Sequence, residues 1–221
     1  KNIRGNFMFN YLDRKVDFNR LGFLNENGTF GFCSWLQLRS NKKFSVFHFM
    51  NINFNGWYNE YLDGWRHDNG GNFNTSIKFS NNWWFYAGQG WNGSRYDLRE
   101  TRGGMPWKKE SGSSFWTGGQ TDVAKSIYLE FGYDHGRARG GNYDEYSLWI
   151  VTRPQSNLEL SFGTNLGKNR DCLFWVGSGT DGRPVFRPLD LDEFDISMRG
   201  IYTFTRNLSL QWYSQLYFSA G

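Results

Sequence analysis

The sequence predicts an all-β fold, namely an antiparallel transmembrane β-barrel of about 14 strands with short periplasmic turns and long extracellular loops. Three observations lead to this prediction. Aromatic side chains are abundant, apolar and polar residues alternate with a period of two, and the connections between these segments alternate between short and long.

The composition excludes several classes of protein. Trp, Tyr and Phe (11, 12 and 21 residues) make up 20% of the 221 residues, which is more than half of the 38% that is hydrophobic. A helical protein would draw instead on Ala, Leu and Met, and disordered chains are poor in aromatics. No apolar run approaches the roughly 18 to 20 residues of a transmembrane helix. Aromatic-rich β architectures remain.

Strict alternation marks the expected strands. In residues 29–39, Phe30, Phe32, Leu36 and Leu38 share one face of the expected strand. The pattern returns at residues 73–79, 127–133, 146–150, 158–162, 194–204 and 208–218, and more noisily at 44–54. Successive strand side chains point to opposite faces, so each segment has one apolar and one polar side. We expect the apolar side to face lipid.

The connections between the expected strands alternate in length. Short turns are expected at residues 40–43, 80–82, 118–122, 153–157, 178–184 and 205–207, and long polar loops at 57–72, 92–113, 134–142 and 165–170. Short turns at one end and long loops at the other are typical of outer-membrane barrels.

Aromatic residues gather near the ends of the expected strands. Amphipathic rings prefer the boundary between lipid and water, so nine residues are candidates for an interfacial girdle. They are Trp57, Tyr58, Trp83, Trp84, Trp91, Trp107, Trp116, Tyr143 and Trp212.

The polar side of the strands is the candidate working surface. Charged groups are costly on a lipid face and tolerable in a water-filled or self-paired interior. The interpretation leaves two roles open, interior salt bridging and lining of a conduction path. The candidate lumen-lining residues are Gln37, Arg39, Asn51, Asn53, Lys78, Glu130, Glu145, Glu159, Asp195, Arg199, Gln211 and Gln215, and Asp134 shares their parity.

Catalytic, cofactor and metal motifs are weak, and we expect no enzyme activity and no cofactor. A three-glycine dinucleotide pattern at residues 88–93 leads into a polar loop rather than a helix. The acidic run from Asp190 to Asp195 lacks EF-hand spacing and is expected to form a solvated turn, with calcium binding left open. The three histidines form no metal-ligand motif and accompany no nucleophile elbow.

Charge and cysteine usage narrow the partners. The formal net charge is +4, and the basic residues are scattered rather than concentrated in a stripe, which argues against nucleic acid. Cys33 and Cys172 lie far apart in expected strands and are interpreted as free thiols, with a disulfide left open.

Four segments carry a resemblance to a known family. They are FNRLGFL at residues 18–24, LRETRGGMP at 98–106, TDVAK at 121–125 and NLSLQWY at 207–213. Their order and spacing resemble the C-terminal barrel of a Bacteroidota-type outer-membrane family catalogued as domain of unknown function 5916, whose members carry an N-terminal domain similar to a family-nine carbohydrate-binding module. The resemblance implies that residues 1–221 are a single barrel domain, a fragment that lacks the N-terminal module and the last strands. It supplies no catalytic residues.

The sequence therefore favours an outer-membrane β-barrel of a Gram-negative bacterium, acting as a pore or as a subunit of an envelope complex. Its expected partners are the lipid bilayer and lipopolysaccharide, other outer-membrane or periplasmic proteins, and glycans. Two alternatives stay open. One is a soluble carbohydrate-binding β domain that uses exposed Trp and Tyr, and the other is a membrane-embedded hydrolase.

Overall fold

The computed structural model describes residues 2–16, 27–102, 104–138 and 140–221. Within these residues it contains strands and no helix, and accordingly no helix that is long and apolar enough to cross a membrane. The strands are β1 (Ile3–Leu12), β2 (Thr29–Ser40), β3 (Phe47–Tyr61), β4 (Arg66–Phe79), β5 (Trp84–Asn92), β6 (Arg95–Asp97), β7 (Trp107–Lys109), β8 (Gly112–Gln120), β9 (Ile127–Ala138), β10 (Gly141–Gln155), β11 (Leu158–Ser178), β12 (Pro184–Thr205) and β13 (Leu208–Ala220).

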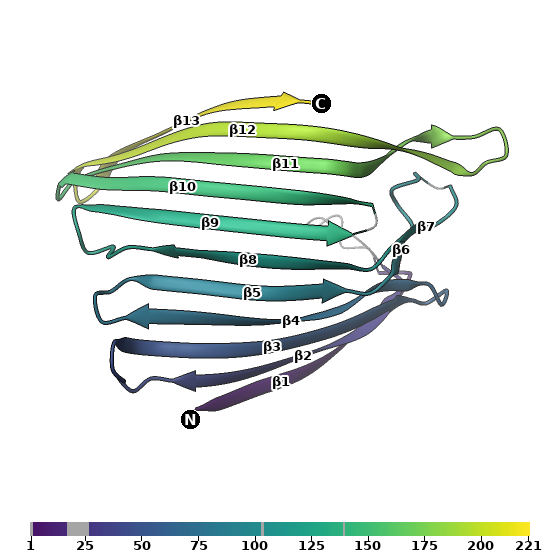
Figure 1. Cartoon of the computed structure of the whole chain (residues 1–221), viewed down its shortest axis with the longest axis horizontal. Helices are drawn as coiled ribbons and strands as arrows, with labels where there is room; N and C mark the ends of the chain where they lie inside the picture. The colour runs from purple at the N-terminus through teal and green to yellow at the C-terminus, as the bar shows by residue number, and fades with distance from the viewer. Residues whose placement is uncertain (1, 17–26, 103, 139) are drawn as a thin grey trace.

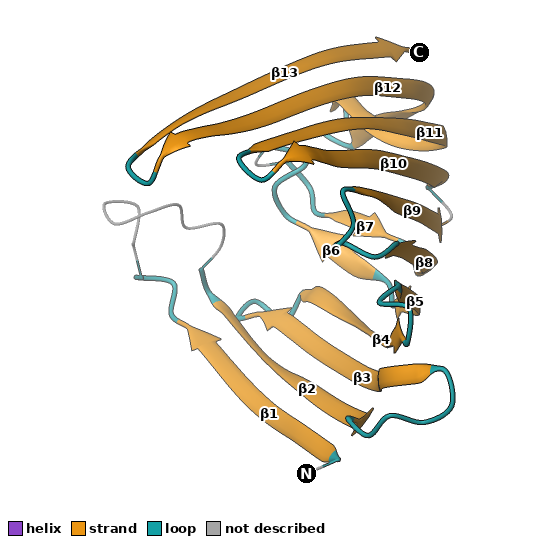
Figure 2. Cartoon of the chain, turned by 90° about the vertical axis from the view of Figure 1, so that its left-hand side faces the viewer, coloured by secondary structure: helices purple, strands orange, loops and turns teal. Residues whose placement is uncertain are grey.

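Eleven of these strands form one antiparallel sheet that follows chain order, β1-β2-β3-β4-β5-β8-β9-β10-β11-β12-β13 (Figure 1). The two short strands β6 and β7 pair with each other in a separate hairpin. The all-β antiparallel prediction is therefore confirmed. The sheet is curved but open, because its two edge strands, β1 and β13, do not pair (Figure 2).

The strand-to-strand connections leave the sheet at two ends. Among the described residues, the turn end holds 41–46, 80–83, 121–126, 156–157 and 206–207, and the loop end holds 13–16, 27–28, 62–65, 93–102, 104–111, 140 and 179–183. Alternation between the ends is as predicted, but the lengths differ. Residues 57–72 and 134–142, predicted as long loops, belong mostly to strands.

The sheet has eleven strands rather than the predicted 14 or so, because two predicted connections lie within strands. Residues 165–170, predicted as a loop, lie inside β11, so residues 178–184 form a loop-end connection rather than a short-side turn. The polar sequence misled the prediction because Asn, Gly, Lys and Arg resemble loop composition, whereas residues 165–170 pair throughout with residues 142–147 of β10. β11 and β12 then continue past β10 at the loop end (Figure 1). The run from Asp190 to Asp195 likewise lies in β12 and not in a turn.

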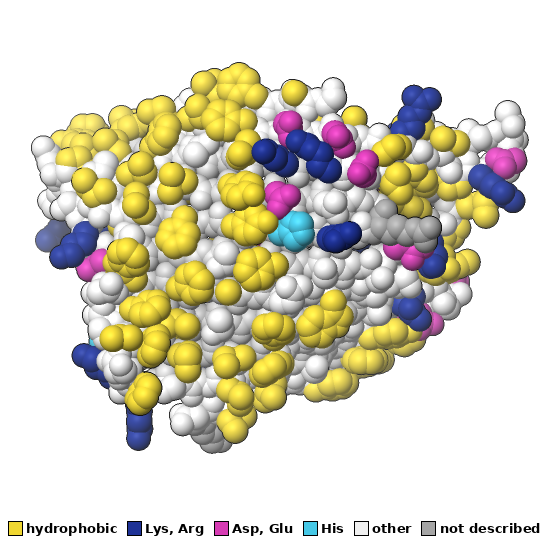
Figure 3. All heavy atoms as spheres, viewed as in Figure 1, with side chains coloured by type: hydrophobic (Ala, Val, Ile, Leu, Met, Phe, Trp, Pro, Cys, Tyr) yellow, Lys and Arg dark blue, Asp and Glu magenta, His cyan; other side chains and the backbone are white. Residues whose placement is uncertain are grey.

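The sheet has an apolar convex face and a polar concave face. Across the convex face, Phe131, Leu148, Thr164, Ile196 and Leu216 are successive cross-strand partners from β9 to β13. Figure 3 shows hydrophobic side chains spread over this face. No second layer covers it in the described part of the chain, so Leu148 is 43% and Leu216 58% exposed. The few buried apolar residues, Tyr61, Tyr128 and Val151, do not make a conventional core.

Large aromatic rings lie against glycines on neighbouring strands. In each case the two residues are direct partners in the strand register, and a Cβ on the glycine would come too close to the ring or overlap it. Glycine weakens a strand because it has no side chain to pack, and a cross-strand aromatic compensates for this. The pairs are Trp57–Gly70, Trp91–Gly71, Trp116–Gly88, Tyr143–Gly136, Trp149–Gly163 and Trp212–Gly200.

Candidate functional site

The concave face collects the polar side chains that alternate with the apolar ones. One row of cross-strand partners runs from Gln37 through Asn53 and Asn74 on the first strands to Asp134, Glu145 and, beyond Gly167, Glu193. The register places all the candidate lumen-lining residues on this face. They are Gln37, Arg39, Asn51, Asn53, Lys78, Glu130, Glu145, Glu159, Asp195, Arg199, Gln211 and Gln215. Whether the face borders a lumen stays a prediction.

Asn53 is the centre of an uncharged amide network on β2, β3 and β4. Its Oδ1 accepts hydrogen bonds from Trp35 Nε1 at 3.1 Å and Gln37 Nε2 at 2.9 Å. Its Nδ2 donates to Asn51 Oδ1 at 3.0 Å and Asn74 Oδ1 at 2.8 Å. The network continues from Asn74 to Asn72 and from Asn55 to Asn72. The polar groups of this wall are thus satisfied largely by one another, which fixes their orientation.

The opposite part of the concave face, on β9 to β12, is rich in carboxylates. Asp195 is 9% exposed and accepts hydrogen bonds from Asn165 Nδ2 at 2.8 Å and Ser197 Oγ at 3.2 Å. Glu193 accepts from Asn169 Nδ2 at 3.2 Å and from the Tyr217 hydroxyl.

Two cations accompany these carboxylates, and both have partners. Arg153 forms an ion pair with Glu159 at 2.7 Å. The Arg199 guanidinium lies between Trp149 and Tyr213, 5.0 and 5.3 Å from the two ring centroids. Cation–π contacts of this kind hold a guanidinium in place even where it has no carboxylate partner.

The acidic run does not assemble into one cluster. Asp192 lies on the convex face and pairs with Arg170 at 2.5 Å, whereas Glu193 and Asp195 lie on the concave face. No group of three or more potential metal ligands occurs in the part of the chain that the structure describes. Cys33 and Cys172 are both free thiols.

The β6–β7 hairpin lies on the concave side near the loop end (Figure 2). The wall and the hairpin enclose a cavity of about 530 Å³. Trp107, Lys108 and Lys109 line it from the hairpin, and Ser114, Tyr143 and Leu173 from the wall. Its size falls within the range of small-molecule sites, and it combines aromatic, cationic and hydroxyl groups.

An ion pair within the hairpin fixes its shape. Lys109 Nζ donates to Asp97 Oδ2 at 2.6 Å, and the backbone N–H groups of Arg99 and Glu100 donate to Asp97 Oδ1, each at 2.9 Å. Burial opposes ionisation of Asp97, but Lys109 and these N–H groups outweigh it and lower its pKa to about 2. The hairpin is also tied to β4, because Arg95 lies 4.0 Å from Asp68.

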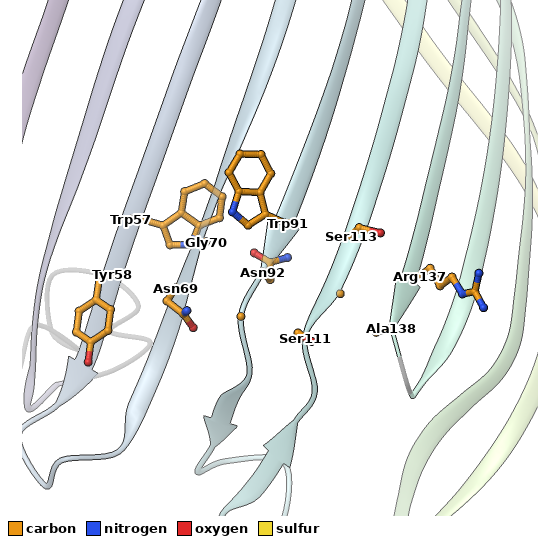
Figure 4. A pocket seen from close by; sticks show the side chains of 12 residues that line it. Trp57, Tyr58, Asn69, Gly70, Trp91, Asn92, Ser111, Ser113, Arg137 and Ala138 are labelled. Carbon is orange, nitrogen blue, oxygen red and sulfur yellow. The ribbon is translucent and has the colours of Figure 1, made fainter.

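A second hollow, of about 840 Å³, lies where β3, β4, β5, β8 and β9 approach the loop end (Figure 4). Trp57 and Trp91 line it and cover the two faces of β4, because they lie against the consecutive residues Gly70 and Gly71. The Arg137 side chain extends away from the two indoles. The rest of the lining is mainly amide, hydroxyl and glycine.

The nine candidate girdle aromatics do not share one face. Tyr58, Trp91 and Trp212 lie on the apolar convex face. Trp57, Trp84, Trp116 and Tyr143 lie on the concave face, so they cannot belong to a girdle on the convex face. Trp83 lies in a turn, and Trp107 in the β6–β7 hairpin. The distance of a residue from the end of its strand does not determine which face its side chain occupies. The nine candidates therefore divide between the two faces.

Several residues of this face lie outside the predicted set. Trp35, Asn72 and Asn74 complete the amide network, and their parity with Gln37 and Asn53 was a usable signal. The hairpin residues Asp97 and Lys109 gave no such signal, because three-residue strands are too short for alternation to be read.

The fold and this site together define an open antiparallel sheet with one apolar face and one polar face. The chain belongs to a family described as a domain of unknown function (DUF5916), whose model matches residues 1–221. No curated protein and no solved structure matches the chain. Of the segments that carried the family resemblance, residues 18–24 lie outside the described residues.

Proposed function

We propose that this chain forms the wall of a β-barrel in a bacterial outer membrane, with its convex face in lipid and its concave face lining a passage for polar solutes. The observation that carries the proposal is the continuous apolar band on the convex face. Soluble monomeric proteins rarely expose contiguous apolar patches larger than a few hundred Å², whereas this band crosses every strand of the sheet.

The height of the band suits a membrane. On β12, convex-face residues run from Phe194 to Phe204 without a charged side chain, which is ten residue steps. At about 3.3 Å per residue this is about 33 Å along the strand. A strand tilt of roughly 40° reduces it to about 25 Å, the height of the apolar band in membrane barrels.

Ionisable residues border the band at the loop end. His135, Asp144, Lys168 and Asp192 are successive cross-strand partners on β9 to β12. His135 Nδ1 and Asp144 Oδ1 are 2.9 Å apart. Figure 3 shows charged side chains gathered in this region of the convex face. At the boundary between lipid and water, the side chains of neighbouring strands should change from apolar to ionisable at the same height along the strands.

The strand directions restrict how the barrel closes. In an antiparallel sheet of eleven strands in chain order, β1 and β13 run in the same direction. An all-antiparallel barrel has an even number of strands. Closure in lipid, where every backbone group needs a partner, therefore calls for an odd number of additional strands between β13 and β1.

Two neighbouring positions on β10 test the proposal. In the natural full-length protein with Cys33→Ser and Cys172→Ser, we would place a single cysteine at Ser147, on the concave face, or at Leu148, on the convex face. We expect a polar thiol reagent to label the Ser147→Cys variant in intact membranes. The Leu148→Cys variant should react only after denaturation. Equal and rapid labelling at both positions would overturn the membrane assignment.

Passage of solutes needs its own measurement. The purified protein in planar lipid bilayers is expected to show stepwise ionic conductance. A protein that inserts but gives no conductance would contradict the passage, while the labelling result would still stand.

A further inference from the structure

We infer that the β6–β7 hairpin is the constriction of the proposed passage, and that its contacts with the β11–β12 extension set the size of the solutes that pass. The inference rests on the proposed function. It starts from the position of the hairpin, which lies toward the concave side when the sheet is seen along its strands (Figure 2) and beyond the loop ends of β8 and β9 (Figure 1).

The hairpin reaches from one part of the wall to another. The chain enters it from β5 and leaves it into β8, and Arg95 approaches Asp68 of β4. At its other side, the Trp107 ring stacks on Phe186 of β12, with ring centroids 4.3 Å apart. The Arg102 guanidinium lies 5.3 Å from the Trp175 ring centroid on β11. It therefore links strands that lie far apart in the sheet order.

The cross-contacts are made with the part of β11 and β12 that projects beyond the neighbouring strands (Figure 1). Trp175 and Phe186 are cross-strand partners there, so one pair of adjacent aromatics receives both contacts. Because β12 pairs with β11 along this extension, the extension can hold the hairpin in place over the concave face.

A cavity of about 530 Å³ lies between the hairpin and the wall. Lys108 and Lys109 on one side and Tyr143 on the other border it. On this inference, a solute that follows the concave face toward the loop end passes through this cavity. Neutral or anionic polar solutes of small-molecule size fit its dimensions and its cationic lining.

The test weakens the contact that holds the hairpin. The full-length protein carrying Trp107→Ala is compared with wild type in liposome swelling, with neutral saccharides of increasing length as solutes. An aromatic pair of this kind shifts a two-state equilibrium by about two- to tenfold. We expect swelling by the largest solutes to increase by about that factor. The matched control is Trp83→Ala, which removes an indole from a turn at the opposite end.

A second variant covers the case in which Trp107→Ala does not fold. In the Cys33→Ser, Cys172→Ser background, cysteines at positions 107 and 186 are joined by a short thiol cross-linker after purification. The cross-linked protein should keep the wild-type size limit or a smaller one, and the same protein before cross-linking should admit larger solutes.

The outcomes separate the two proposals. Swelling in wild type that neither variant changes would overturn the constriction and leave the passage intact. A wild-type protein that passes no solute at all would overturn both.

Discussion

The indole of Trp116 on β8 lies against the α-carbon of Gly88 on β5, so closely that a methyl group at position 88 would overlap the ring. Only glycine, which has no Cβ, leaves room for the indole ring at this position. The same relationship recurs around the sheet, which explains why many glycines of this chain lie within strands rather than in turns.

Gly88→Ala is therefore expected to destabilise the protein by about 1 to 3 kcal/mol, the usual cost of overpacking. The measurement is the thermal midpoint in detergent. Gly167→Ala is the control, because a Cβ there would meet its nearest neighbour, Glu193, at an ordinary 3.5 Å. If both variants lose the same stability, the ring contact is not the cause.

A cation on the convex face should prevent stable insertion. Phe162→Arg places a guanidinium between Ile150 and Met198, and at the centre of a bilayer this costs about 2 to 4 kcal/mol. Ser147→Arg puts the same group on the concave face, between Gly132 and Asn165, and should cost much less. The ratio of folded to unfolded protein in lipid vesicles gives both values, and a convex face in water would show no such difference.

Loss of Asn53 should disturb more than one bond. Asn53→Leu leaves two donors and two acceptors of the network without their partner. The expected loss in the free energy of unfolding is about 2 to 4 kcal/mol, because each unsatisfied half-buried group carries its own cost. Denaturant titration measures it. Asn10→Leu, on the concave face of the edge strand β1, serves as the comparison and should be nearly neutral.

Acid should loosen the β6–β7 hairpin before it affects the sheet. The pKa of Asp97 falls from its ordinary value of 3.8 to about 2 in the folded protein. Ionised Asp97 thus stabilises the hairpin above about pH 4, and this contribution is lost as pH falls through about 2. With allowance for solvent screening it amounts to about 1 kcal/mol.

Limited proteolysis by an acid-active protease can follow that change. Wild-type cleavage between β6 and β7 should increase as pH falls from about 4 to about 2. The Asp97→Asn variant should be cleaved readily throughout. Pronounced pH dependence in the variant would show that another group is responsible.

Alternation predicted most of the sheet because it reports directly which side chains share a face. Residues 29–39 and 194–204 are strands in the structure, and Gln37 and Asp195 lie on the polar face that their parity indicated. Alternation did not predict the parts of strands that extend beyond the apolar band, because their Asn, Gly and Asp residues are also typical of loops. Residues 66–72 of β4 are an example, where amide pairs such as Asn55–Asn72 replace apolar packing.

The candidate site was predictable only in part. Parity identifies which side chains face inward, but it does not say that Trp107 would stack on Phe186, a residue 79 positions further along the chain (186 − 107 = 79). That contact forms because the curvature of the sheet brings β12 close to the β6–β7 hairpin. The same limit applies to Arg199, whose position between Trp149 and Tyr213 follows from the pairing of the four strands β10 to β13.

The long arm formed by the ends of β11 and β12 has a practical consequence for work on living bacteria. Gly179 and Gly182, at its tip, belong to the short connection between β11 and β12. Under the proposed function, a peptide epitope inserted between them would stand clear of the membrane, and antibody binding to whole cells would then report which way the protein is oriented.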